Sequence, residues 1–140
     1  MPMALPHVNY LAVLVAAIAT FLLGGLWYSP LLFAKAWVKA HGYTVERVKE
    51  MQKGAGKAYG GSVVAYLVMA FVLAVLLSYC GASSWQEGAW IGFLCWLGFA
   101  ATIGFTANLF SEKSLTTYLI DAGYQLVYLI LMGVILAIWK

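Results

Sequence analysis

Four apolar runs, each long enough to cross a bilayer, constrain this chain more than any other feature. They cover residues 7–29, 58–80, 86–107 and 116–139. About 20 helical residues, rising ~1.5 Å each, cross a hydrocarbon core of ~30 Å. The apolar residues are continuous and do not alternate, which favours helices over strands. We therefore predict an all-α integral membrane protein, a single membrane domain over residues 1–140, with four transmembrane helices in two hairpins.

Composition supports a membrane class and carries no sign of an enzyme. The chain is 64% hydrophobic and 9% charged, whereas soluble domains are nearer half apolar and a quarter charged. The sequence contains no Ser-His-Asp arrangement, no glycine-rich phosphate loop and no His/Cys spacing typical of metal sites. We therefore expect no catalytic residues, no cofactor, no bound metal and no nucleic-acid partner; the expected surroundings are the lipid bilayer.

Basic residues predict the orientation, because they remain on the cytoplasmic side of membrane proteins. The loop at 30–57, between the first and second runs, holds six of them: Lys35, Lys39, Arg47, Lys49, Lys53 and Lys57. The turn after the third run adds Lys113, and the turn at 81–86 has none. Lys140, the last residue, is the one basic residue that does not fit this distribution. We expect this loop inside and both termini on the outer side.

The long loop itself has helical patterning. In "PLLFAKAWVKAH", Phe33 and Trp37 share one helical face, and Lys35 and Lys39 share another. This pattern predicts an amphipathic helix in the cytoplasmic interface, with its lysines near anionic headgroups. A second short helix is expected in "TVERVKEMQK", with Thr44 as its N-cap. The alternative is a solvated basic loop that only sets topology.

Small residues and cysteines in the runs allow two further expectations. Gly88 and Gly92 form a Gly-x-x-x-Gly pair, which lets helix backbones approach closely. The spacing does not distinguish an internal contact from the contact of a homo-oligomer. Cys80 and Cys95 lie at different depths of their runs, so we predict two free thiols rather than a disulfide.

The fourth run carries a carboxylate, Asp121, one helical turn before the amide of Gln125. Ionisable groups within membrane helices are costly and face the protein interior or a water-filled cavity. The predicted topology brings other polar and aromatic residues to the same membrane layer. The candidate ligand-binding residues are Asp121, Gln125, Tyr128, Tyr124, Asn108, Tyr28, Ser29, Trp27 and Ser62. We expect them to form a cytoplasm-facing polar pocket. Lys35, Lys57 and Lys113 are expected close by as counter-charges, and the carboxylate can pair with Lys35 or Lys57.

Two interpretations of this pocket remain open. In the first, the protein is a small transporter or a binding protein, and Asp121 takes a cation or a small polar ligand. In the second, the polar groups form a structural hydrogen-bond network. A separate alternative for the function of the protein is a non-catalytic accessory or structural subunit of a larger membrane complex.

Two stretches of the sequence resemble a known family. "GGLWYSPLLFAKAW" (24–37) and "LIDAGYQLV" (119–127) are similar to motifs of small bacterial membrane proteins catalogued as domain of unknown function 1761. The resemblance covers nearly the whole chain and implies a four-helix protein of a bacterial plasma (inner) membrane. It supplies no activity, cofactor or catalytic residue. Ala34 stands where the family pattern leads us to expect glycine.

Overall fold

The computed structural model describes residues 4–140, and within them all regular structure is helical. Four helical runs are long and apolar enough to cross a membrane: α1 (Tyr10–Trp27), α4 (Ala55–Tyr79), the run from Trp85 to Phe110, and α7 (Leu115–Ile138). The third run consists of α5 (Trp85–Cys95), the π-helical segment η1 (Trp96–Ala100) and α6 (Ala101–Phe110). The predicted all-α class with four such helices is confirmed.

Two short helices occupy the loop between α1 and α4. These are α2 (Ala34–His41), which ends at Gly42 with a φ of 71°, and α3 (Val45–Lys53). Thr44 caps α3 as predicted, because its hydroxyl accepts a hydrogen bond from the backbone N–H of Arg47 at 3.1 Å. The structure thus has helices where the loop pattern predicts them. Their position in a membrane interface stays a prediction.

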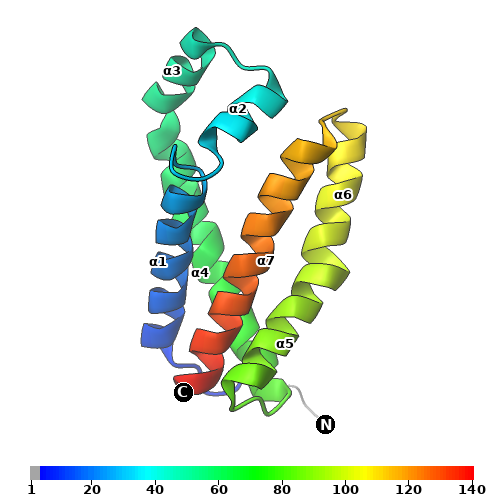
Figure 1. Cartoon of the computed structure of the whole chain (residues 1–140). Coiled ribbons are helices and arrows are strands. Elements are labelled where there is room, and N and C mark those ends of the chain that lie inside the picture. Colours follow the sequence, from blue (N-terminus) through cyan, green and yellow to red (C-terminus); the bar gives the residue numbers. More distant parts are fainter. Residues whose placement is uncertain (1–3) are drawn as a thin grey trace.

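The molecule has one strongly basic end. Helices α2 and α3 and the α6–α7 turn lie together there, and the C-terminus lies at the opposite end (Figure 1). Seven of the eight Lys and Arg residues belong to these segments or to the start of α4. We call this the basic end. It brings together the two groups of charges on which the predicted orientation depends.

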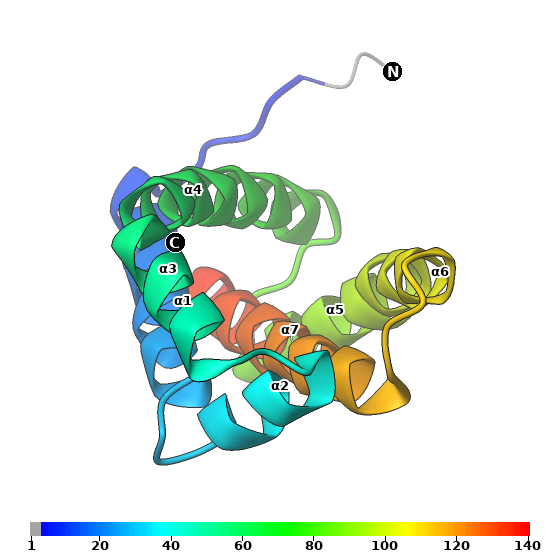
Figure 2. The same cartoon turned by 90° about the horizontal axis from the view of Figure 1, so that it is seen from above.

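Helix α7 lies at the middle of the bundle, as seen from above (Figure 2). It packs most extensively on α5, also contacts α1, α4, α6 and α2, and is the most buried of the four apolar runs. Its buried residues include Met132 and Ala137, which are 0% and 1% exposed. Any site that uses α7 is therefore held from several sides.

Glycines allow the close approach of α5 to α7. A Cβ atom at Gly88 would overlap the backbone carbonyl of Gly133, and one at Gly92 would overlap the carbonyl of Leu129. The Gly-x-x-x-Gly pair therefore makes a contact within the chain, which was one of the two predicted alternatives, the other being a contact between copies of a homo-oligomer. Both cysteines are free thiols, as predicted.

Candidate functional site

The carboxylate of Asp121 is bound to the end of α1. Asp121 lies about two turns after the start of α7, and its Oδ1 accepts a hydrogen bond from the hydroxyl of Tyr28 at 2.6 Å. The two residues are 93 positions apart. A short O–H···O bond to an ionised acceptor is stronger than a neutral one. The polar residue of α7 thus joins two of the long helices.

Two indoles hold α7 immediately beside Asp121. The Nε1–H of Trp27 donates to the carbonyl oxygen of Ile120 at 3.0 Å, and that of Trp96 donates to the carbonyl oxygen of Ala122 at 2.9 Å. Trp96 begins the π-helical segment η1, a local widening of the helix that is frequent at functional sites. The backbone around the carboxylate is therefore fixed from α1 and from the third run.

Tyr124 and Tyr128 form the packed layer beside this anchor. The hydroxyl of Tyr124 donates to the carbonyl of Thr20 at 2.7 Å and is hydrogen-bonded to the Tyr66 hydroxyl at 3.1 Å. The Tyr124 ring meets those of Tyr28 and Tyr128 edge-on, with centroids 5.5 and 4.8 Å away. Both Tyr124 and Tyr128 are 6% exposed. They support the site from the core, and neither lines the polar hollow beside Asp121.

A polar hollow of about 150 Å³ opens on the other side of Asp121, between α6 and α7. Its lining residues are Gly104, Ala107, Asn108, Ser111, Lys113, Tyr118, Asp121, Ala122 and Gln125. One water molecule needs roughly 10–15 Å³ of such volume. The space is therefore sufficient for a hydrated ion or a small molecule. We call it the Asp121 hollow.

Several acceptors in the Asp121 hollow have no donor among the described residues. The amide nitrogen of Asn108 donates to the carbonyls of Lys113 and Ser114 at 3.1 and 3.4 Å, which leaves its Oδ1 without a donor. Oδ2 of Asp121 and the Gln125 side chain likewise have no hydrogen-bond partner in residues 4–140. Free acceptors beside a carboxylate suit a cation or a polar ligand.

Not every predicted residue joins this site. The Ser29 hydroxyl donates to the Leu26 carbonyl at 2.6 Å and shapes the turn after α1. Ser62 is half-buried on α4 and makes no side-chain hydrogen bond to a described residue. Helix α4 packs on α1 and α7, whereas the hollow lies on the α6 side of α7. Neither serine therefore lines the Asp121 hollow, and a role of these two residues in ligand binding stays a prediction.

Asp121 does not pair with Lys35 or Lys57 among residues 4–140, so that part of the prediction is wrong. Over residues 4–140 the one ion pair joins Arg47 to Glu50 at 3.4 Å, on the exposed surface of α3. The physical reason is that Tyr28, on a rigid helix end, supplies a donor without ordering a long lysine side chain. Of the three lysines expected near the carboxylate, Lys113 lines the hollow.

Sequence reasoning missed two aromatic residues of α2 near the site. The His41 ring packs against those of Trp37 and Tyr43, with centroids 4.1 and 4.8 Å away, and Trp37 lies edge-on to Tyr28 at 6.2 Å. The ring nitrogens His41 Nε2 and Trp37 Nε1 are sealed from solvent without a described partner. Burial lowers the pKa of His41, the positive charge of Lys113 lowers it further, and Asp121 opposes them. The signal was present, because His41 continues the Phe33–Trp37 face at the same spacing.

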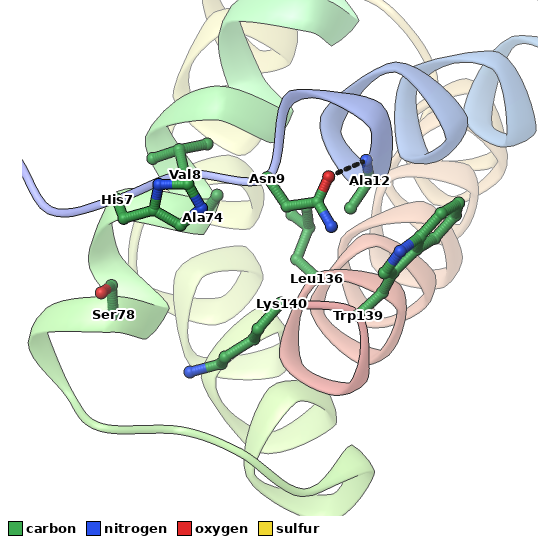
Figure 3. Close-up of a pocket in the computed structure, with 9 residues that line it drawn as sticks. All are labelled: His7, Val8, Asn9, Ala12, Ala74, Ser78, Leu136, Trp139 and Lys140. Atoms are coloured by element: carbon green, nitrogen blue, oxygen red, sulfur yellow. Dashed lines mark hydrogen bonds between the residues drawn. The ribbon is translucent and has the colours of Figure 1, made fainter.

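A second, smaller pocket lies where α1 starts and α7 ends, at the end of the molecule opposite the basic end, and Figure 3 shows its lining residues. It has a volume of about 40 Å³, and its lining residues are His7, Val8, Asn9, Ala12, Ala74, Ser78, Leu136, Trp139 and Lys140. The Asn9 side chain caps α1 there, because its Oδ1 accepts from the N–H groups of Leu11 and Ala12 at 3.1 Å. This pocket contains no carboxylate side chain. The Asp121 hollow is therefore the better candidate for a ligand site.

Comparison with known proteins finds one family. Residues 11–137 match the family described as "Protein of unknown function (DUF1761)". The chain belongs to this family. The DUF1761 match includes both partners of the Tyr28–Asp121 bond and every residue that lines the Asp121 hollow. No curated protein and no solved structure matches the chain.

Proposed function

We propose that this DUF1761 protein is a multi-pass protein of a bacterial plasma membrane that binds a cation or a small polar ligand in the Asp121 hollow. The protein works as a small transporter or ligand-binding protein and not as an enzyme. One observation carries the proposal. A carboxylate on an apolar, centrally packed helix has one oxygen held by Tyr28, and it lines a hollow with further free acceptors.

The energetics support binding over a closed structural network. An ionised carboxylate in a membrane helix is costly unless it is paired, hydrogen-bonded or in contact with water. In a closed network each polar group has its partners within the protein. Here Gln125 and one oxygen of Asp121 have none among the described residues. A bound cation or ammonium group would supply the missing partner.

The distribution of charge supports access from the cytoplasm. The hollow includes Asn108, Ser111 and Lys113, which lie at the end of α6 and in the turn that follows. That turn belongs to the basic end, which the positive-inside tendency assigns to the cytoplasm. Both termini then lie outside.

The test is a ligand titration of the purified protein in nanodiscs, followed by tryptophan fluorescence. Trp27 and Trp96 donate to the carbonyls on either side of Asp121, so occupancy of the hollow should change their emission. We expect a saturable response to at least one of Na⁺, K⁺, Mg²⁺, methylammonium and glycine, and we expect Asp121→Asn to abolish it. The matched control is Glu46→Gln, which removes one carboxylate from an exposed position of α3 at the same end. A response that survives Asp121→Asn, or no response in the wild type, contradicts the proposal.

The exposed apolar surface of the third run favours a second candidate function, that of an accessory subunit in a larger membrane complex. Only 11% of its most apolar window is buried within the chain, and Phe99, Ile103 and Leu109 are among its exposed side chains. Such a surface fits a protein partner, including a second copy, as well as it fits lipid. Photo-crosslinking from position 103 in native membranes tests this candidate. A protein adduct from position 103 and none from exposed Val68 of α4 would support it.

A further inference from the structure

We propose that the ligand of the Asp121 hollow is a small zwitterion, with an ammonium group and an anionic carboxylate or phosphate in one molecule. This inference rests on the proposed function and names the ligand class of the same site. The hollow brings one acidic and one basic side chain to one space, and the two are not paired with each other.

The two charges of the hollow are Asp121 and Lys113. They form no ion pair, since the one ion pair of residues 4–140 is Arg47–Glu50. Paired charges would largely satisfy each other and leave little to bind. Separated charges each stay free for a group of the opposite sign. A bare cation would use Asp121 and be repelled by Lys113, whereas a zwitterion uses both.

The other lining groups give the ligand an orientation. Gln125 lies one turn beyond Asp121 on α7, away from the basic end, and its amide oxygen and the Oδ1 of Asn108 are acceptors without described donors. An ammonium group has three donors, which these oxygens and the carboxylate can accept. Lys113 lies in the exposed turn after α6, near Ser111, which carries a hydroxyl group and also lines the hollow. The ammonium group therefore binds in the helical part, and the anionic group binds near the turn.

The size of the space suits a small ligand. About 150 Å³ is enough for a small amino acid or a phosphoethanolamine group to lie between the two charges. Two sources provide this chemistry: a free solute from the cytoplasm, or the headgroup of a phosphatidylethanolamine molecule beside α6. The ligand chemistry is the same in both, so the experiment must distinguish the source.

The decisive variant is Lys113→Gln, because zwitterions and bare cations should respond to it in opposite directions. The probes are glycine, O-phosphoethanolamine and methylammonium, titrated against the protein in phosphatidylcholine nanodiscs. Losing a charge-assisted contact should weaken binding of both zwitterions by about tenfold or more. Losing a like charge should leave methylammonium binding unchanged or strengthen it. Asp121→Asn should abolish binding of all three. Lys35→Gln is the matched control, because Lys35 is exposed on α2 and does not line the hollow.

The possible outcomes separate this inference from the proposed function. If methylammonium binds as well as glycine and O-phosphoethanolamine, and Lys113→Gln strengthens all three, the site takes bare cations; the zwitterion inference is then overturned and the proposed function stands. If no probe gives a saturable response that depends on Asp121, both are overturned. Repeating the titration in phosphatidylethanolamine nanodiscs identifies the source. Competition by that lipid indicates a headgroup, and unchanged affinity indicates a free solute.

Discussion

At the scale of single residues, the site depends on the bond between Tyr28 and Asp121. The sequence was sufficient to place these two residues in one layer, because charge asymmetry orders the helix ends and helical spacing defines a polar face. It was not sufficient to choose the partner of the carboxylate. Loop lysines and Tyr28 all lay within reach by topology, and only the turn after α1 decides which donor arrives. Which hydrogen-bond acceptors line the hollow could not be predicted either, because that depends on how α6 lies beside α7.

Tyr28→Phe removes the donor to Asp121 and keeps the ring. We expect a loss of roughly 1–2 kcal/mol in stability, because the carboxylate loses a charge-assisted bond in a half-buried position. Thermal unfolding in detergent measures the change, and the double variant with Asp121→Asn should lose less than the sum of the two singles. Tyr59→Phe is the control, since Tyr59 is 58% exposed at the same end of the bundle. Equal shifts for the two tyrosine variants would argue against the anchor.

At the scale of elements, helix positions could be predicted well and their irregularities could not. No bound of the four long runs differs from its predicted position by more than three residues. The π-helical segment η1 was missed, because "WLGFA" contains no proline and no interruption of the apolar pattern. Its first residue makes a tertiary contact, because Trp96 donates to the Ala122 carbonyl of α7. Short-range patterns do not contain that contact.

The close approach of α5 to α7 predicts that adding one methyl group at the contact lowers stability. Gly88→Ala places a Cβ atom against the Gly133 carbonyl and should cost about 1–3 kcal/mol, since backbone cannot move aside cheaply. Gly98→Ala lies in the same helical run, and no atom of another helix is within 4 Å of the added methyl group, so it should be nearly neutral. The difference in midpoint of thermal unfolding between these two variants measures the contact. A cost at Gly98 equal to that at Gly88 would show that the effect is not the close approach.

Helix α2 should loosen from the bundle in acid. His41 has a lowered pKa when α2 is packed, so the released helix binds a proton more readily than the packed one. Above the ordinary histidine pKa of 6.5, His41 is neutral in both states and the packing of α2 is fully favoured. As the pH falls below 6.5, the released helix takes up a proton first, and packing weakens until the pH has passed the lower pKa of the packed state. Hydrogen exchange of the α2 amides at pH 8 and pH 5, corrected for intrinsic rates, measures this change. His41→Gln should reduce the difference, and His7→Gln at the opposite end should not; an unchanged difference in His41→Gln would exclude this residue as the cause.

At the scale of the whole molecule, the collection of basic groups at one end predicts a single orientation. A cysteine introduced at Arg47, after replacement of Cys80 and Cys95, should resist an impermeant thiol reagent in intact cells and react after permeabilisation. The reason is that moving the six basic residues of the 30–57 loop across the membrane is unfavourable. A cysteine introduced at exposed Ser83, in the turn between α4 and α5, should react without permeabilisation. The reverse pattern would invert the topology and place the hollow on the outside.

The most direct test of a ligand site at Asp121 is the labelling rate of a cysteine introduced at Gln125, in the same cysteine-free background. Gln125 lines the hollow one helical turn beyond the carboxylate. We expect a small impermeant thiol reagent to reach this position only from the membrane side that labels position 47. Saturating glycine or methylammonium should slow the reaction, and Asp121→Asn should remove that protection. Labelling from the opposite side alone, or a rate that neither compound changes, would contradict a ligand site in the Asp121 hollow.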